Sequence, residues 1–212
     1  MEKNSSTRNV GKAYFCTWLV TAGLLFGSTA GSVQGAESAE IIRNCSECHG
    51  TDGLGFKPGV PHINGQQEHL LTNMINAFQQ GKRSTKVKDH RDIPAADTAA
   101  LAKHYAQQKA ARPKSATIPE LVIRGEAIYL KSCADCHVDN GRDSDKEAPL
   151  MAAQDLTYLV AQTLAFKAGE RKFPFLMDGA YKGLSDEDLT AVAHFFAAQD
   201  QVTPQQGRRR RR

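Results

Sequence analysis

The chain has 212 residues, with 27 Lys and Arg against 23 Asp and Glu, and a formal net charge of +4. The basic excess lies at the two ends: without the N-terminal segment described next and the final run of five arginines, 19 basic residues face 22 acidic ones. The remaining body is therefore slightly acidic. Its length of about 176 residues allows one or two small domains.

The N-terminal segment has the features of a secretory signal peptide. Three basic residues precede an apolar stretch at 13–26, and small residues follow it. This order predicts a signal peptide over residues 1–36 that is removed after Gly35 or Ala36. The alternative is an uncleaved membrane anchor, for which the apolar stretch is short. Export would place the protein in the periplasm, where nucleic acid is not an expected partner.

The motif C-x-x-C-H occurs twice, at residues 45–49 and 133–137, and it uses four of the five cysteines. This spacing is typical of c-type haem attachment, in which two thiols form thioethers with the haem vinyl groups and the adjacent His binds the iron. We therefore predict two covalently bound haem c groups. The expected thioether anchors are Cys45, Cys48, Cys133 and Cys136, and the expected proximal iron ligands are His49 and His137.

Paired cysteines have three other uses, namely a four-thiolate zinc site, a redox-active dithiol and a structural disulfide. The two pairs lie 85 residues apart, counted from Cys48 to Cys133. That gap far exceeds a zinc ribbon, and zinc would not explain a His after each pair. A thioredoxin-like dithiol needs a βαβ pattern, which the sequence does not show. Haem attachment is the interpretation that fits best.

Three helices are expected in the first half of the chain. A short helix over 38–44 leads into the first motif. An amphipathic helix over 67–80 ends at Gly81, in the position after the C-cap where glycine is favoured. A closing helix covers 94–107. No segment alternates with period two, so the fold class is all-α.

The second half repeats the first. A constant offset of 88 residues relates the two motifs and continues to Arg83 and Arg171, after which the offset becomes 91. The corresponding helices are expected over 119–131, 156–168 and 185–198, the second of them again amphipathic and the third capped by Ser185. A repeat of this length is the size of a small domain. Each half is too small to bury much apolar surface alone, so haem should complete its core.

The repeat and the polar, proline-containing stretch between its copies give the domain organisation. Pro113 and Pro119 should make this linker semi-stiff. The arginine run at the C-terminus predicts a disordered basic end, which is usually only solvated but could contact anionic lipid or an acidic partner. The predicted segments are a signal peptide 1–36, a first domain 37–108, a linker 109–118, a second domain 119–200 and a basic tail 201–212.

These features resemble class I cytochromes c in the tandem two-haem arrangement of the cytochrome c4 type. The resemblance covers nearly all of the mature chain. It implies two tandem cytochrome c-like domains that pass single electrons and turn over no substrate, and a proline carbonyl near Pro61 or Pro149 that accepts a hydrogen bond from the proximal His. The cytochrome subunit of flavocytochrome c sulfide dehydrogenase is similar in plan. The other features that carry the resemblance are the downstream prolines, the Gln-x3-Leu-Leu and Gln-x3-Tyr-Leu runs, the two Phe-x2-Gly-x-Arg ends and Leu184–Asp188.

The resemblance places a distal methionine before the last helix of each half. Met177 occupies that loop in the second half and is the expected distal ligand, with Met151 as a rival on the proximal side. No Met occurs between Gly81 and Ile93. His90 is the expected distal ligand of the first iron, since Asp89 aligns with Met177. An open five-coordinate iron, or ligation by Lys86 or Lys88, remains an alternative, and His62 is expected to be structural or exposed.

The sequence therefore predicts a periplasmic electron carrier with two haems. Its partners would be redox proteins such as a membrane complex, a dehydrogenase, an oxidase or a flavoprotein, with at most peripheral membrane contact through the Arg tail. The second hypothesis is an electron-transfer subunit of a flavocytochrome c sulfide dehydrogenase-like complex. The third is an enzyme whose five-coordinate first iron binds small molecules, although no catalytic acid pair is evident.

Overall fold

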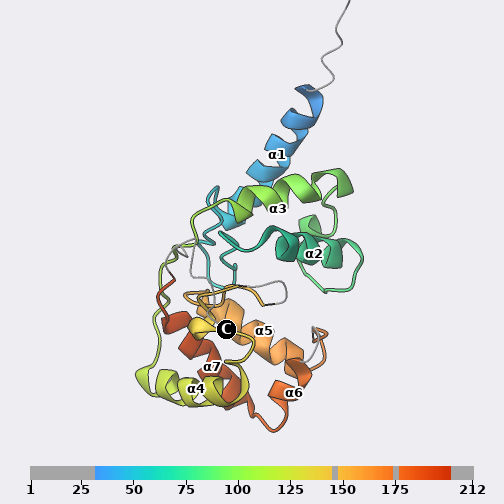
Figure 1. The fold of residues 1–212 in the computed structure, drawn as a ribbon. Coiled ribbons are helices and arrows are strands. Elements are labelled where there is room, and N and C mark those ends of the chain that lie inside the picture. Colours follow the sequence, from blue (N-terminus) through green and yellow to red (C-terminus); the bar gives the residue numbers. More distant parts are fainter. Residues whose placement is uncertain (1–31, 145–147, 174–176, 202–212) are drawn as a thin grey trace, which may run out of the picture. The chain divides into compact units, whose positions relative to one another are not determined.

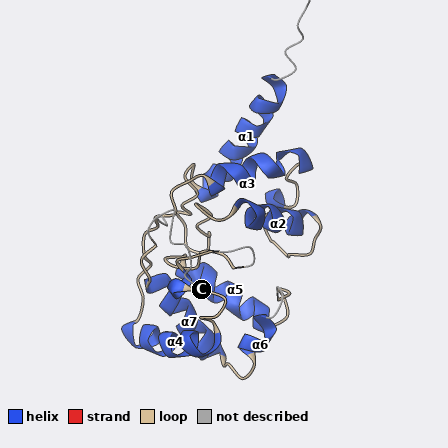
Figure 2. Cartoon of the chain, in the orientation of Figure 1, coloured by secondary structure: helices blue, strands red, loops and turns tan. Residues whose placement is uncertain are grey.

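The computed structural model describes residues 32–144, 148–173 and 177–201, which belong to one compact unit (Figure 1). The signal peptide prediction up to residue 31 and the tail prediction from residue 202 lie outside these residues. The described residues form helices, turns and loops without any strand, so the all-α prediction is confirmed (Figure 2). Within the same ranges, no helix is long and apolar enough to cross a membrane.

The first half (residues 37–108) contains two long helices, one of moderate length and two short 3₁₀ turns. They are α1 (Ser32–His49), α2 (Glu68–Gln79), η1 (Lys88–His90), η2 (Ala95–Asp97) and α3 (Thr98–Ala106). The helix expected over 38–44 is longer than predicted and continues through the first C-x-x-C-H motif. The closing helix expected from residue 94 begins instead as a 3₁₀ turn after Pro94, and the α-helix follows from Thr98.

The second half (residues 119–200) repeats this plan with one extra helix. Its elements are α4 (Pro119–Ser132), η3 (Asp139–Gly141), α5 (Leu156–Lys167), α6 (Met177–Tyr181) and α7 (Asp186–Ala198). Ser185 caps α7 as predicted: its hydroxyl accepts from the Asp188 amide at 3.1 Å, and the Asp188 carboxylate accepts from the Ser185 amide at 3.0 Å. This reciprocal capping box fixes where α7 begins.

The amphipathic prediction is correct for α2 and wrong for α5, whose apolar residues are spread around the helix. The reason is that α5 is contacted from two sides. It packs on α7, and Tyr158 and Gln162 of α5 receive the Arg83 side chain from the first half. A helix with neighbours on two sides does not need one wholly polar face.

The main hydrophobic cluster lies in the second half, where α4 and α7 pack side by side (Figure 1). Tyr129 of α4 stacks on Phe195 of α7, with ring centroids 4.6 Å apart. A Cβ atom on Gly125 would lie 2.1 Å from the Ala191 carbonyl oxygen, so only glycine allows this close crossing. In the first half, by contrast, α2 has no buried residue, so this half depends more on other groups for its stability.

Two glutamines form reciprocal hydrogen bonds between the halves. The Gln154 side chain accepts from the His62 amide at 2.6 Å and donates to the His62 carbonyl at 2.8 Å. The Gln66 side chain binds the main chain of Leu150 in the same way, with both distances 2.9 Å. Both pairs of equivalent residues are 88 positions apart, so these contacts follow the internal repeat. Each glutamine thereby holds the residue that follows Pro61 or Pro149.

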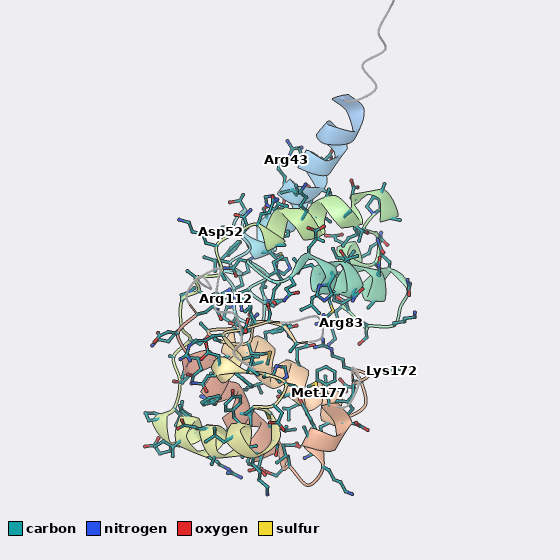
Figure 3. All side chains as sticks on the ribbon, viewed as in Figure 1. Arg43, Asp52, Arg83, Arg112, Lys172 and Met177 are labelled. Atoms are coloured by element: carbon teal, nitrogen blue, oxygen red, sulfur yellow. The ribbon has the colours of Figure 1, made fainter. Side chains whose placement is uncertain are left out.

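The linker is packed rather than free, because Arg112 is 8% exposed and contacts both halves (Figure 3). Its guanidinium donates to the Asn64 side-chain and carbonyl oxygens at 3.0 and 2.9 Å, and to the Leu150 carbonyl at 3.2 Å. All three acceptors are neutral, and burial lowers the pKa of Arg112 to about 9. Arg112 therefore joins the linker to both halves through buried hydrogen bonds.

We expect Arg112→Met to destabilise the protein by about 2–4 kcal/mol, because two buried Asn64 oxygens lose their charged donor. Urea unfolding of the haem-containing protein measures this change. Lys114→Met is the matched control in the same linker, since Lys114 forms only an exposed ion pair with Asp200 at 2.8 Å. Exposed ion pairs contribute about 0–1 kcal/mol. Equal losses in the two variants would contradict the role given to Arg112.

Candidate functional site

The cysteines of both motifs are free thiols. Cys45 and Cys133 are half-buried, whereas Cys48 and Cys136 are exposed. Burial raises the pKa of Cys45 and of Cys133 to about 11. Because all four cysteines are free thiols, neither pair forms the disulfide considered above. A redox-active dithiol would need a lowered thiol pKa, and these two thiols show the opposite.

The zinc alternative also finds no support. Among the residues that the structure describes, no group of three or more His, Cys, Asp or Glu side chains could hold a metal ion. The two cysteine pairs thus do not converge on a common site. Each pair belongs to its own half and has its own neighbouring His.

His49, at the C-terminal end of α1, is fixed through one ring nitrogen. Its Nδ1 donates to the Pro61 carbonyl at 3.1 Å, which is the contact that the family resemblance implied for this proline. Burial lowers the pKa of His49 and keeps the imidazole neutral. With Nδ1 engaged, Nε2 is the nitrogen left to bind a metal, an arrangement common among metal-ligating histidines.

His90 lies on the last position of η1 and faces His49. The two ring centroids are 6.1 Å apart, with the ring planes inclined by 33°. The His90 Nδ1 is hydrogen-bonded to the Thr85 hydroxyl at 3.2 Å, and the ring stacks on Phe78 with centroids 4.9 Å apart. Burial lowers the pKa of His90 as well. Sequence reasoning missed the roles of Thr85 and Phe78. The signal for Phe78 was its place in the Phe-x2-Gly-x-Arg run, which the second half repeats with Phe166.

The separation of these two rings provides a test of whether the residues fit a haem iron. Two metal–nitrogen bonds of about 2 Å each, together with the two ring radii, give a centroid separation of about 6 Å. The measured 6.1 Å agrees with that value. The Pro61 carbonyl can only accept, so His49 Nδ1 carries the proton and leaves Nε2 free to bind the iron. In His90, Nδ1 is engaged by the Thr85 hydroxyl, so Nε2 is the nitrogen that would bind the iron. The donor set of the first half therefore fits an iron with one imidazole on either side.

The lysine alternatives are less well placed than His90. Lys88 lies at the surface, with its side chain 79% exposed and its ammonium 3.7 Å from the Asp92 carboxylate. Lys86 is exposed as well. An amine must also lose its proton before it can bind a metal, which costs free energy at neutral pH.

The second motif follows α4 directly, with Cys133 as the C-cap residue and a turn that continues to His137. The Tyr129 hydroxyl donates to the His137 carbonyl at 2.7 Å. The His137 ring meets Phe196 of α7 edge to face, with centroids 5.8 Å apart. His137 is therefore held against the main hydrophobic cluster from two helices.

Met177 and Met151 differ in their surroundings. Met177 was expected in a loop but is the first residue of the short helix α6, where it is half-buried (Figure 3). The same helix carries Tyr181, which packs on Phe173 with centroids 4.8 Å apart. Met151 packs against the hydrophobic cluster. It also lies close to Gly141, since a Cβ atom added to that glycine would be 2.8 Å from the Met151 Cβ. Met151 therefore fills the core, which leaves Met177 as the methionine available at the loop before α7.

His62 is structural, in agreement with one of the two expectations for it. It is 6% exposed, and within the described residues its Nδ1 has no hydrogen-bond partner. Burial, and then the nearby Arg112 cation, lower its pKa from 6.5 to about 4. His62 is therefore neutral in the folded protein at neutral pH.

We expect the stability of the protein to fall as the pH decreases from 6.5 to about 4, the two pKa values of His62 in the unfolded and folded chain. Between these values only the unfolded chain binds the proton, so this stabilisation is complete above pH 6.5 and is lost below it. The shift corresponds to about 3 kcal/mol at most. Urea midpoints at a series of pH values measure it. His62→Phe should flatten the profile, and an unchanged slope would contradict this prediction.

Comparisons with known proteins agree with the site. Residues 122–199 match the cytochrome c family. The chain is 26% identical over 199 residues to cytochrome c4 of Pseudomonas aeruginosa, which covers 84% of this chain and 94% of that protein. It is 29% identical over 195 residues to the thiosulfate dehydrogenase electron acceptor of Thiomonas intermedia, with 85% and 89% covered.

The fold agrees as well. The structure of reduced recombinant cytochrome c4 from Pseudomonas stutzeri matches with a TM-score of 0.65 at 23% identity, covering 78% of this chain and 98% of that one. Together with the sequence relatives, this match confirms the expected fold. The cytochrome c family match and the cytochrome c4 relative support haem c as the cofactor and electron transfer as the function.

Proposed function

We propose that this chain binds one haem c in each half. It is a c-type cytochrome of the cytochrome c4 type, and it acts as an electron carrier rather than as an enzyme. It would work in the periplasm after removal of residues 1–36. The domain boundaries follow the repeat, with residues 37–108 around the first haem, 119–200 around the second and 109–118 between them. When bound, each haem iron supplies a reversible one-electron couple.

The observation that carries the proposal is the pair of facing imidazoles in the first half. Cys45 and Cys48 would anchor the first haem, and His49 and His90 would hold its iron. The hydrogen bond from His49 to Pro61 orients its ring and fixes the tautomer that leaves Nε2 unprotonated. Both protein ligands of the first iron would thus be imidazole nitrogens.

The second haem would be anchored by Cys133 and Cys136, with His137 and Met177 as iron ligands. His137 is held by Phe196 and by the Tyr129 hydrogen bond to its carbonyl. A thioether ligand raises the reduction potential relative to an imidazole. The first haem should therefore have the lower potential, and electrons would run from the first haem to the second.

Two measurements test this proposal on the purified, processed protein. Intact mass spectrometry should show the polypeptide plus two haem groups, and low-temperature EPR of the oxidised form should show one bis-imidazole and one imidazole–thioether signal. The reduced protein should bind carbon monoxide only slowly, because the gas must first displace a protein ligand from either iron. A colourless protein, or a mass with fewer than two haems, would overturn the two-haem assignment.

The relative that accepts electrons from thiosulfate dehydrogenase favours a particular class of donor. We infer that a sulfur-oxidising dehydrogenase is the donor, and that an oxidase or another terminal acceptor receives the electrons. Rapid mixing with a reduced thiosulfate dehydrogenase should reduce the cytochrome in a reaction that slows with added salt. Copurification with a flavoprotein would instead favour a flavocytochrome c sulfide dehydrogenase-like complex, and would contradict a freely diffusing carrier.

A further inference from the structure

We propose that the second half positions the distal ligand of the first haem through Arg83. In this arrangement Tyr158 and Gln162 hold the Arg83 guanidinium, Arg83 holds Phe78, and Phe78 holds the ring of His90. The inference rests on the proposed function, because it concerns His90 as an iron ligand. It adds that a contact between the halves sets the orientation of that ligand.

The first step is the contact between His90 and Phe78. The two rings stack with centroids 4.9 Å apart and planes inclined by 27°. Stacking restricts rotation of the imidazole about its side-chain bonds, and the Thr85 hydroxyl holds Nδ1 at 3.2 Å. The ring plane of His90 is therefore set by one apolar and one polar neighbour. A change in the position of Phe78 would therefore change the orientation of the His90 ring.

The second step is the contact between Phe78 and Arg83. The Arg83 guanidinium carbon lies 4.6 Å from the centroid of the Phe78 ring, and the guanidinium also contacts the Met74 sulfur. A planar guanidinium over an aromatic face is a favourable cation–π arrangement. Phe78 thus contacts both the His90 ring and the Arg83 guanidinium. The position of Phe78 therefore depends on what fixes the guanidinium.

The third step crosses to the second half. Arg83 Nη2 donates to the Tyr158 hydroxyl and to the Gln162 side-chain oxygen, both at 3.0 Å (Figure 3). Both acceptors belong to α5, 75 and 79 residues away in sequence. Although burial raises the pKa of Tyr158, the Arg83 and Arg171 cations bring it below its ordinary value. The phenol is therefore a well-placed acceptor for this guanidinium.

The two equivalent arginines of the repeat differ in the half that they contact. Arg171 is the counterpart of Arg83 and lies over Phe166 at 4.3 Å in the same manner. However, Arg171 donates at 2.7 Å to Gln162, which belongs to its own half. In the described contacts, Arg83 reaches a helix of the other half, whereas Arg171 contacts α5 of its own half. The coupling should therefore affect the first haem and spare the second.

The test uses the full-length haem-containing protein with Tyr158→Phe and Gln162→Leu combined. The EPR signal of the bis-imidazole haem should shift. Carbon monoxide, which must displace His90, should bind the reduced first haem about tenfold faster than in the wild type, because both hydrogen bonds that hold the Arg83 guanidinium are lost. Arg83→Lys, which keeps the charge but not the planar fork, should produce the same shift even if the double variant fails to fold. Arg83→Lys leaves the contact between Arg171 and Gln162 intact, so in that variant the spectrum of the second haem should not change.

Gln67→Ala is the matched control. It removes a different hydrogen bond between the halves, from Gln67 Nε2 to the Ser144 carbonyl at 2.7 Å, and should leave both haem signals unchanged. An unshifted first-haem signal in the double variant and in Arg83→Lys would overturn the coupling, as would an equal shift in Gln67→Ala. A wild-type protein without any bis-imidazole signal would instead refute His90 ligation, so the two failures can be told apart.

Discussion

Replacing Cys45 and Cys48 by serine together will yield a protein that carries one covalent haem and whose first half is loosely packed. The thioether bonds that hold the first haem require both thiols. Of the two helices that pack together in the first half, α2 has no buried residue and α3 has four. Intact mass should decrease by one haem. Limited proteolysis should then cleave preferentially within residues 37–108.

The Cys133→Ser and Cys136→Ser double variant is the matched comparison. It should also lose one haem, but its second half should resist proteolysis better. There, α7 alone buries eight residues, and α4, α5 and α7 share one hydrophobic cluster. Equal protease sensitivity of the two halves would contradict this difference in haem dependence. Retention of two haems in either variant would refute the assignment of the anchors.

Replacing His90 by methionine should raise the reduction potential of the first haem and leave that of the second unchanged. A thioether stabilises the ferric iron less than an imidazole does. The expected rise is on the order of 0.1 V, within the range of about 0.8 V that axial ligands cover. A spectroelectrochemical titration measures both potentials. The bis-imidazole EPR signal should be replaced by a second imidazole–thioether signal.

Asp89→Met is the control for this substitution. Asp89 is the residue that aligns with Met177 in the repeat, yet it is exposed, whereas His90 faces His49. Methionine at position 89 should therefore leave both potentials unchanged. If Asp89→Met raised the lower potential and His90→Met did not, the ligand would follow the sequence alignment and our assignment of His90 would be wrong.

The helices show what local patterns could and could not predict. Ser185 and Asp188 fixed the start of α7 because a capping box involves only neighbouring residues. Gly81 ends its helix as predicted, with φ of +65°, and its repeat partner Gly169 ends α5 in the same way, with φ of +76°. The amphipathic prediction was wrong for α5, because its polar residues meet a side chain from the other half. No local pattern contains that information.

The candidate site divides in the same way. Sequence alone determined the two haem-attachment motifs, the repeat and the all-α class, because thioether anchoring and helix formation depend on residues close together in the chain. The repeat and the family resemblance predicted His90 as a ligand, but the tertiary structure was needed to show its ring facing His49. The tertiary structure alone showed that Arg112 is buried and that Arg83 reaches α5 of the other half. These contacts join residues from 38 to 79 positions apart. They depend on how complete helices and loops pack, which residue spacing does not encode.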